Sequence, residues 1–339
     1  MKKTVCMVLA MLAGFCFSAD LFANEKDHQK KNYENEKFVW TDNYVSEGNH
    51  AALAPSTEEI VTTCLSKDGK PLRWVRKNDI YKYGKFTGTS TLETALYNMA
   101  VDEMINNFEK DGTLRTGLYW GGVWTRDVSY SSLLSLAYMC PDKVKNSLEV
   151  KIDRMGRIIQ DTGTGGSWPC SSDRVVWALS AWNIYLATGD IEWLQKAYPV
   201  IIKSLECDDM VVFNPQTGLY RGESSFIDWR EQSYPTWAQP ADIYLSECLG
   251  TNAAYYGVLK VTADMAAALG FKKDVKKYTQ KAEALKKAIN DKFWVEEDGY
   301  YASYWYGRQN FIRTQHSETL GESFCVLFGI ADEERAAKV

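Results

Sequence analysis

The chain has 339 residues, with 39 Lys and Arg against 44 Asp and Glu, which gives a formal net charge of −5. An acidic chain without basic blocks argues against binding to nucleic acid or to an anionic membrane surface. There are only three histidines, which leaves almost no candidates for a zinc site or a Ser-His-Asp triad. The chemistry of the chain is therefore expected to be carboxylate chemistry.

Residues 1–23 have the pattern of an export signal. Lys2 and Lys3 form a basic start, residues 5–17 an apolar core, and residues 21–23 a cleavage site. The apolar run is short for a membrane span and a polar stretch follows it, while nothing later is apolar enough to cross a bilayer. We expect a mature protein in the periplasm or outside the cell.

The six cysteines beyond residue 23 are widely spaced and include no Cys-x-x-Cys pair. In a chain of this size most are expected to be buried thiols, and export leaves room for one disulfide. The sequence implies neither a metal nor a cofactor. A calcium site built from loop carboxylates stays open as an alternative.

Residues 24–89 are expected to form a lead-in segment before the main domain, residues 90–339. Residues 24–60 look irregular. Short β-like runs at 72–75 and 80–83 lie near Asp68-Gly69, a pattern typical of a small hairpin.

Helices are expected to dominate from Ser90 onward. Ser90 and Glu93 form a capping-box pattern at the start of the first helix. Apolar residues from Val144 to Ile159 recur at helical spacing and predict another. The expected helices span about residues 90–111, 127–138, 144–159, 172–187, 190–205, 242–269 and 272–289, with one more from about 317 and another after 329.

The connections between these helices alternate between short turns and long loops. The long loops, residues 112–125, 161–171, 207–240 and 291–315, are rich in aromatics and glycine. Helical hairpins with this alternation favour a toroid whose long loops gather on one face, where binding normally occurs. The alternative is an ordinary irregular α bundle.

The first candidate site element runs from Trp120 to Tyr130 and contains two adjacent glycines that allow a ligand to approach the backbone. Trp124 offers a ring, and Arg126 with Asp127 offers donors and acceptors that suit vicinal sugar hydroxyls. Asp127 could equally be a helix cap.

The second element is the loop that ends at the fourth helix. Trp168 follows two glycines and is a candidate stacking platform for a sugar ring. Asp173 and Arg174 are candidate binding residues, although a capping Asp with a surface Arg explains them as well. The other tryptophans of this region lie at core spacing and are interpreted as packing residues: Trp177, Trp182 and Trp193.

The third element, Glu223 to Glu231, reads Glu-Ser-Ser-Phe-Ile-Asp-Trp-Arg-Glu. Acids beside a cation and flat rings are what an enzyme needs to hold a sugar and protonate its glycosidic oxygen. Asp228 and Glu231 are the candidate proton donors, and Trp229 is a candidate pocket wall. The alternative interpretation of this segment is a solvated surface loop.

An aromatic run at residues 300–306 is a further candidate wall of the pocket. His316, Glu318 and Glu322 follow it. Glu318 could as easily cap the eighth helix.

These elements resemble those of the six-hairpin glycosidases, which include glucoamylases, glycogen-debranching glucosidases, trehalases and processing α-glucosidase-like enzymes. Trp124-Thr-Arg-Asp127 resembles their sugar-binding Trp-x-Arg-Asp element. Residues 176–190 look like their paired-helix segment. Glu223-Ser-Ser-Phe-Ile-Asp228 is similar to the element that carries the catalytic acid. The resemblance covers roughly residues 90–339.

The resemblance implies an all-α fold, an (α/α)6 toroid that is incomplete at the C-terminus behind a short irregular or β N-terminal segment. It implies an exported, inverting glycoside hydrolase that cleaves an α-linked glucoside or mannoside, with Asp228 favoured over Glu231 as the acid. The catalytic base is then expected beyond Val339, and the oligomeric state is left open.

Two other functions remain from the sequence. One is a degenerate carbohydrate-binding toroid that binds sugar without cleaving it. The other, ranked last, is an epimerase or polysaccharide lyase on a similar toroid, because epimerases of that shape rely on histidines.

Overall fold

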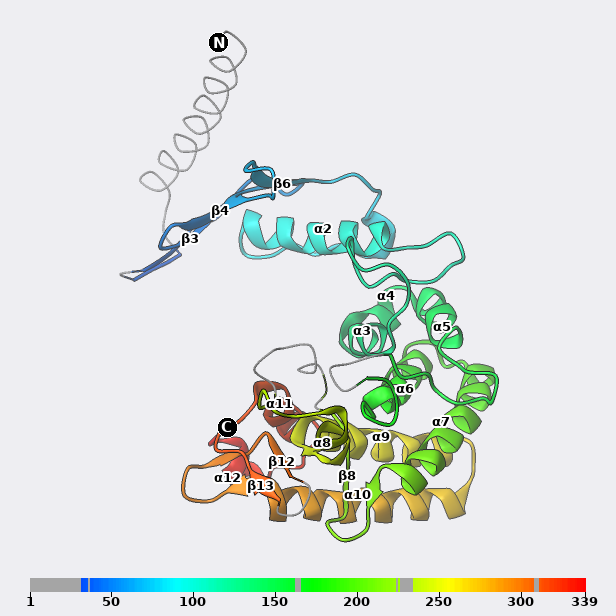
Figure 1. Cartoon of the computed structure of the whole chain (residues 1–339). Helices are drawn as coiled ribbons and strands as arrows, with labels where there is room; N and C mark the ends of the chain where they lie inside the picture. Colours follow the sequence, from blue (N-terminus) through cyan, green and yellow to red (C-terminus); the bar gives the residue numbers. More distant parts are fainter. Residues whose placement is uncertain (1–31, 36, 162–165, 224, 226–233, 308–310) are drawn as a thin grey trace, which may run out of the picture. The chain divides into compact units, whose positions relative to one another are not determined.

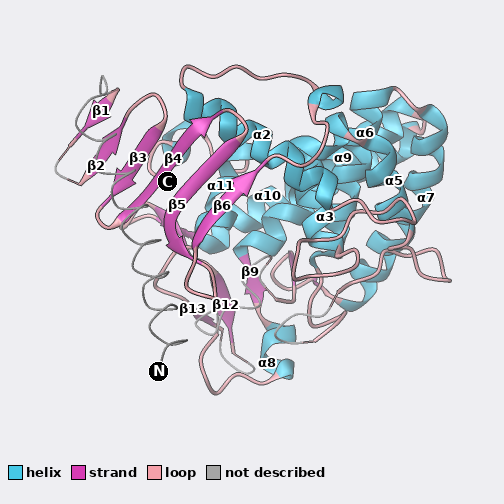
Figure 2. Cartoon of the chain, turned by 90° about the horizontal axis from the view of Figure 1, so that it is seen from above, coloured by secondary structure: helices cyan, strands magenta, loops and turns pink. Residues whose placement is uncertain are grey.

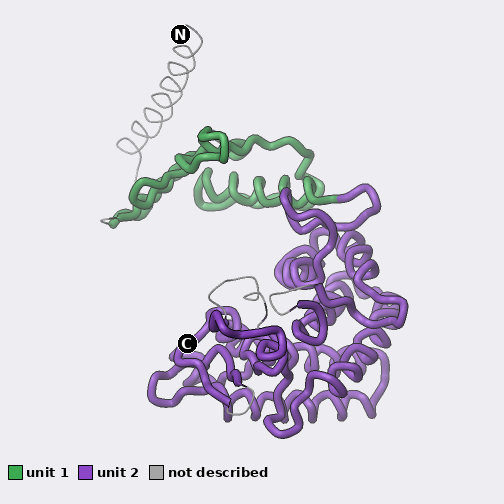
Figure 3. The backbone as a smooth tube through the Cα atoms, in the orientation of Figure 1, with its two compact units in different colours: residues 1–108 green, residues 109–339 purple. Residues whose placement is uncertain are grey.

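The computed structural model describes residues 32–35, 37–161, 166–223, 225, 234–307 and 311–339. The chain divides into two compact units, residues 1–108 and 109–339 (Figure 3). The predictions for the export signal, for the candidate acids Asp228 and Glu231, and for Trp229 fall outside the described residues.

The first unit contains one antiparallel sheet in which neighbouring strands follow chain order, β1 to β6 (Figure 2). Its strands are β1 (Tyr33–Glu34), β2 (Phe38–Trp40), β3 (Tyr44–Glu47), β4 (His50–Ser56), β5 (Glu59–Leu65) and β6 (Pro71–Val75).

The prediction of an irregular segment up to residue 60 is therefore wrong. The strands there carry Ala51, Ala52 and Pro55 in place of β-branched residues, so their own pattern is weak. Pairing across the sheet, as between Tyr44 and Leu53, supplies the missing signal. The hairpin expected near Asp68-Gly69 is β5–β6, whereas residues 81–83 form a 3₁₀ turn.

Helix α2 (Thr91–Asn106) begins with the expected capping box. Ser90 Oγ accepts the N–H of Glu93 at 3.2 Å, and the Glu93 carboxylate accepts the N–H of Ser90 at 3.2 Å. Leu92 and Ala95 bury the helix against Ile60 and its neighbours in the sheet, so α2 groups with the strands. The domain boundary before residue 90 stays a prediction.

The second unit is built from helices joined by short two- and three-stranded sheets (Figure 1). Its helices are α3 (Thr125–Ser131), the π-helical stretch η2 (Ser132–Leu136), α4 (Ala137–Met139), α5 (Pro141–Glu149), the 3₁₀ turn η3 (Asp173–Val176), α6 (Trp177–Thr188), α7 (Ile191–Val211), α8 (Pro240–Leu245), α9 (Leu249–Ala268), α10 (Lys272–Phe293), α11 (Thr319–Leu327) and α12 (Glu333–Ala336). Its strands are β7 (Phe213–Asn214), β8 (Leu219–Tyr220), β9 (Glu247–Cys248), β10 (Trp294–Val295), β11 (Tyr300–Tyr301), β12 (Tyr304–Tyr306) and β13 (Ile312–Arg313).

The helix predicted over 144–159 is wrong beyond α5. Asp153 Oδ1 accepts the N–H groups of Met155 and Arg157 at 2.8 and 2.9 Å, and Gly156 adopts φ +73°. This turn brings Ile152 opposite Ile158 in an isolated β-bridge. Local turn chemistry outweighs the apolar periodicity here.

The helix predicted over 242–269 is broken into α8 and α9. Ser246 is extended between them, and its hydroxyl donates to the carbonyl of Ile243 at 2.6 Å. Glu247 then pairs with Trp305 of β12, so a sheet contact with a distant segment decides the break.

The core of the second unit lies around α6 and α9. Trp177 is fully buried and packs 5.9 Å from the ring of Trp193 on α7, as expected for packing residues. Helix α10 covers α9 with one apolar stripe at helical spacing. The stripe consists of Tyr278, Ala282, Leu285, Ile289 and Phe293.

The six described cysteines are free thiols, and three of them are buried. No helix among the described residues has the length and apolar character that crossing a bilayer requires.

Replacing Trp177 by Ala should lower the free energy of unfolding by about 3–5 kcal/mol, because it empties a site buried on all sides. Urea denaturation measures this loss. Trp182→Ala is the matched control on the same helix, where the side chain is partly exposed. An equal loss in the two variants would contradict the packing role of Trp177.

Candidate functional site

A buried cluster around Asp173 brings the first and second candidate elements together. Asp173, at the start of η3, is 1% exposed, and its Oδ1 accepts the amide of Gln160 at 2.9 Å. Its Oδ2 accepts the hydroxyl of Ser225 at 2.6 Å and lies 3.6 Å from Arg126 Nη1. These three partners fix the direction of the Asp173 carboxylate.

Tyr130 extends this cluster along α3. Its hydroxyl lies 3.0 Å from Ser225 Oγ, and its ring stacks on Phe324 of α11 at 5.4 Å. Burial, followed by the charge of Asp173, raises the pKa of the phenol far above its ordinary value. The hydroxyl is therefore a neutral hydrogen-bonding group at every working pH.

The start of α3 is anchored from outside the helix. Trp124 occupies the N-cap without a side-chain hydrogen bond, and the N–H of Thr125 donates to the Asp161 carboxylate. Asp161 is also paired with Lys151 at 2.6 Å. This anchor fixes the helix turn that carries Arg126 and Asp127.

Asp127 and Trp124 lie in the expected place. Asp127 is half-buried on the first turn of α3, and the N-cap position belongs to Trp124. The Trp124 ring is half-buried and meets Trp120 edge-on at 6.2 Å. Trp120 is 64% exposed, so this aromatic corner is open to a ligand.

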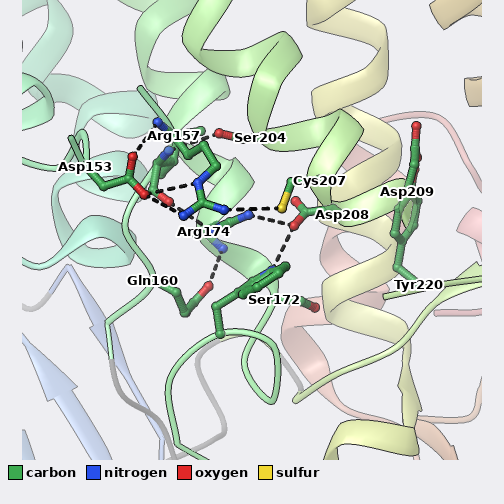
Figure 4. A network of polar contacts seen from close by, with 12 residues as sticks. Asp153, Arg157, Gln160, Ser172, Arg174, Ser204, Cys207, Asp208, Asp209 and Tyr220 are labelled. Carbon is green, nitrogen blue, oxygen red and sulfur yellow. Dashed lines mark hydrogen bonds and ion pairs between the residues drawn. The ribbon is translucent and has the colours of Figure 1, made fainter. Parts of the chain in front are cut away.

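Arg174 and Trp168 belong to a second buried network, centred on Asp208 of α7 (Figure 4). Arg174 Nη2 and Trp168 Nε1 each donate to Asp208 Oδ1 at 2.9 Å, and the guanidinium lies 4.7 Å from the centre of the Trp168 ring. The polar groups of these two residues thus serve the protein's own framework. The sugar contacts proposed for them stay predictions.

Two opposing effects act on the pKa of Asp208: burial and the charge of Arg174. Burial raises the pKa of its carboxyl to about 6, against the lowering effect of Arg174. Its Oδ2 has no hydrogen-bond partner within the described part of the chain. Burying such an ion pair carries a desolvation cost in free energy. The pair therefore fixes the geometry of this region but adds little net stability.

Gln160 joins the two networks. Its amide nitrogen donates to Asp173 at 2.9 Å. Its amide oxygen accepts the N–H of Arg174 at 2.7 Å (Figure 4). The assignment of the amide follows from these two partners.

The third candidate element is held at its N-terminal end. Glu223 is 1% exposed, its carboxylate accepts the Ser171 hydroxyl, and its N–H donates to the carbonyl of Cys170 at 2.8 Å. Gly222 adopts φ +125°, and a Cβ there would lie 2.5 Å from Ser172 Oγ. Glycine is therefore required for this close approach.

The far end of the element is held by Tyr234. Its hydroxyl lies 3.4 Å from Cys248 Sγ, and its ring packs 5.2 Å from Tyr304 of β12. The described residues on either side of Asp228 thus lie beside the Asp173 cluster, at Ser225, and beside the aromatic run, at Tyr234.

The sequence interpretation missed Tyr130, Ser225 and Gln160 as members of the cluster, and Asp208 as the centre of the second network. Tyr130 lies in the first candidate element and Ser225 in the third, but nothing in the sequence indicates that their side chains are in contact. Among the described residues, no three His, Cys, Asp or Glu side chains gather as metal ligands.

Comparison with known proteins now bears on this geometry. The bacterial alpha-L-rhamnosidase 6 hairpin glycosidase domain matches residues 160–339, which is more than half of the chain. The chain belongs to this family. The expected fold class, a six-hairpin toroid of helices with β structure at the N-terminus, is confirmed.

Three solved structures share this fold at low identity. The GH78 rhamnosidase of a Bacillus species matches with a TM-score of 0.56 and 17% identity over 79% of this chain and 27% of its own. The GH63 mannosylglycerate hydrolase of Thermus thermophilus gives 0.53 and 12% over 71% and 74%. The neutral trehalase Nth1 of Saccharomyces cerevisiae gives 0.51 and 14% over 67% and 53%.

The chain therefore spans about a quarter of the length of the rhamnosidase it resembles. No curated protein matches the chain.

Breaking the Arg174–Asp208 pair should lower the free energy of unfolding by about 3–5 kcal/mol, because either Arg174→Met or Asp208→Asn leaves the other group buried without its partner. The double variant should lose less than the sum of the two. Denaturant titration measures all three variants.

The control is Lys196→Met, which breaks the exposed Lys196–Glu149 pair and should change stability by less than about 1 kcal/mol. If Arg174→Met were as mild as this control, the second network would not be a structural element.

Proposed function

We propose that the chain is the sugar-cleaving domain of an exported glycoside hydrolase acting on an α-linked neutral sugar with inversion. The observation that carries this proposal is the family match over residues 160–339, a region that contains Gln160, Asp173 and Ser225 of the buried cluster. Export to the periplasm or beyond rests on the signal pattern of residues 1–23.

The charged side chains of the cluster favour an uncharged sugar as the substrate. Among the described residues, the cluster includes the guanidinium of Arg126, which already faces Asp173, and Glu223 places a buried carboxyl two positions before Ser225 in the chain. A uronate or sialate would bring a further negative charge into this surrounding. An uncharged sugar, recognised through its hydroxyls, fits the donors and acceptors of the site.

Three neutral glycosides are candidates. The sequence motifs favour an α-linked glucoside or mannoside, and the family match adds an α-L-rhamnoside. We rank the rhamnoside first, because the family covers more than half of the chain, whereas the solved structures are 12–17% identical and bear on the fold alone.

Asp228 is proposed as the general acid. Phe226, Ile227 and Trp229 flank it in the sequence and would raise its pKa by desolvation, as a proton donor requires. In the inverting reaction this proton passes to the leaving oxygen as the glycosidic bond breaks, and a second carboxylate takes a proton from the attacking water. The two carboxyls of such a pair stand about 6.5–9.5 Å apart.

Asp228→Asn should lower kcat on an unactivated α-glycoside by about two to four orders of magnitude. On an aryl glycoside with a good leaving group the loss should be much smaller, because that oxygen needs no proton. Hydrolysis of paired rhamnoside, glucoside and mannoside substrates by the purified chain measures both effects.

Glu231→Gln is the control for the other candidate acid in the same segment. The acid is Glu231 if this variant shows the leaving-group dependence and Asp228→Asn does not. Calorimetric binding of a sugar without release of product by the wild-type chain would favour the degenerate carbohydrate-binding function.

A testable role also follows for Arg126. Arg126→Lys keeps the charge beside Asp173 but loses the planar fork, so it should raise KM at least several-fold. An unchanged KM would remove Arg126 from the sugar site.

A further inference from the structure

Glu318 is a buried acid that has no hydrogen bond of good geometry, although the N–H groups of Gly321, Leu320 and Gly250 lie near its carboxyl. Both of its carboxyl oxygens are shielded from solvent, and neither has a hydrogen-bond partner in the portion of the chain that the structure describes. Buried polar groups are nearly always hydrogen-bonded, and a buried charge is costly unless it is paired. An exception of this kind calls for an explanation.

Capping of α11 does not explain it. Glu318 occupies the N-cap position, yet its side chain makes no cap hydrogen bond. Other caps in the same chain do: Asp190 accepts the N–H of Trp193 at 3.0 Å, and Asp332 accepts the N–H of Arg335 at 2.9 Å. Glu318 thus stands at the N-cap, as the alternative left open by the sequence has it, but its side chain forms no cap hydrogen bond of good geometry.

The backbone is shaped around this carboxyl. A Cβ at Gly321 would lie 2.3 Å from Glu318 Oε1 and 2.9 Å from the backbone nitrogen of Gly250. Glycine at 321 thus lets the Glu318 side chain fold back toward the start of α9. Leu249 closes the same space, since its Cγ lies 2.8 Å from that Cβ position.

Glu318 lies behind the Asp173 cluster. Phe324, on the same short helix, stacks on Tyr130, and the Tyr130 hydroxyl contacts Ser225, which donates to Asp173. The charge of Glu318 also acts on Tyr130 and raises the pKa of the phenol, after burial and the larger effect of Asp173.

Among the described residues, the titratable groups that interact with Glu318 carry no positive charge. They are Glu322 and Cys325 on α11, Cys248 before α9 and Tyr130 on α3. Burial raises the pKa of the Cys248 thiol to about 12 and that of Cys325 further, so both thiols are neutral. An ionised Glu318 would therefore add an unbalanced negative charge beside Asp173.

We propose that Glu318 is a positioning residue of the candidate sugar site that works as the neutral acid, supporting Tyr130 and, through it, Ser225 and Asp173. In this state Asp173 and Arg126 remain a balanced pair. Loss of the Glu318 proton places a second negative charge behind Tyr130 and loosens the alignment of Ser225 and Asp173 with the sugar.

The protonation state agrees with this geometry. Burial raises the pKa of Glu318 to about 7, although the N–H groups of Gly321, Leu320 and Gly250 lie close enough to lower it. The acid is therefore mostly neutral below pH 7 and ionises above it. Because the folded chain holds this proton more tightly than the unfolded chain, the folded chain loses stability as pH rises from about 4.5 toward 7, and the loss is complete above 7.

The test compares Glu318→Gln with Glu322→Gln. Glutamine keeps the size of the neutral acid and cannot ionise. Glu322 lies one turn further along α11, where its carboxylate accepts the N–H of Tyr301 at 3.1 Å, so it is the matched control.

The first measurement needs no substrate. Above pH 7, Glu318→Gln should raise Tm by about 2–6 °C relative to wild type, and the two should converge near pH 5. Glu322→Gln should show a smaller gain, because burial also raises the pKa of Glu322 but its carboxylate keeps the hydrogen bond from Tyr301. A Glu318→Gln chain that unfolds or loses stability at every pH would make Glu318 a structural residue and overturn the proposal.

The second measurement rests on the hydrolase activity proposed above. Wild-type kcat/KM should fall above about pH 7, and Glu318→Gln should move this alkaline limb upward by at least one pH unit while keeping activity at pH 6 within about three-fold. An unmoved limb overturns the proposal. So does a loss of more than a hundred-fold at every pH in a folded chain, since that indicates direct proton transfer by Glu318.

Failure of the proposed function is distinguishable from failure of this inference. A chain that hydrolyses no α-glycoside still reports the pH-dependent gain in Tm of Glu318→Gln. Activity with no such gain retains the hydrolase and removes the role of Glu318.

Discussion

The buried carboxylate of Asp173 needs partners, and meeting that need draws distant segments of the chain together. Arg126 comes from α3, Gln160 from the loop after α5, and Ser225 from the element that leads to Asp228. A carboxylate that is 1% exposed is tolerable only with such contacts. The site is therefore assembled by the same interactions that make the carboxylate tolerable in the interior.

Gln160 extends this polar network, because its side-chain amide donates to the Asp173 carboxylate and accepts the backbone N–H of Arg174. Arg174 is held in turn by Asp208, in the middle of α7. Polar contacts thus run without interruption from Ser225, through Asp173, Gln160 and Arg174, to a helix of the core. Preorganisation of this kind keeps a binding geometry in place without a cost at the moment of binding.

Structural features were predicted correctly from the sequence where they depend on residues close together in the chain. The capping box at Ser90 and the packing role of Trp177 both have short-range signatures. The missed features depend on long-range pairing. The break at Ser246 follows from a strand contact with residues near 305, and the early strands are stabilised by one another. Asp208 looks like an ordinary polar residue of α7 until Arg174 and Trp168 are seen on it.

The contact between Trp177 and Trp193 has a consequence outside function. Their ring centres are 5.9 Å apart and their planes meet at 34°. Two indoles so close and not parallel couple their electronic transitions, which adds a pair of circular dichroism bands of opposite sign to the ordinary helical spectrum. This optical signature belongs to the meeting of α6 with α7 and to no single helix. It gives the hairpin an intrinsic spectroscopic label, one that vanishes when packing is lost even while the helices themselves persist.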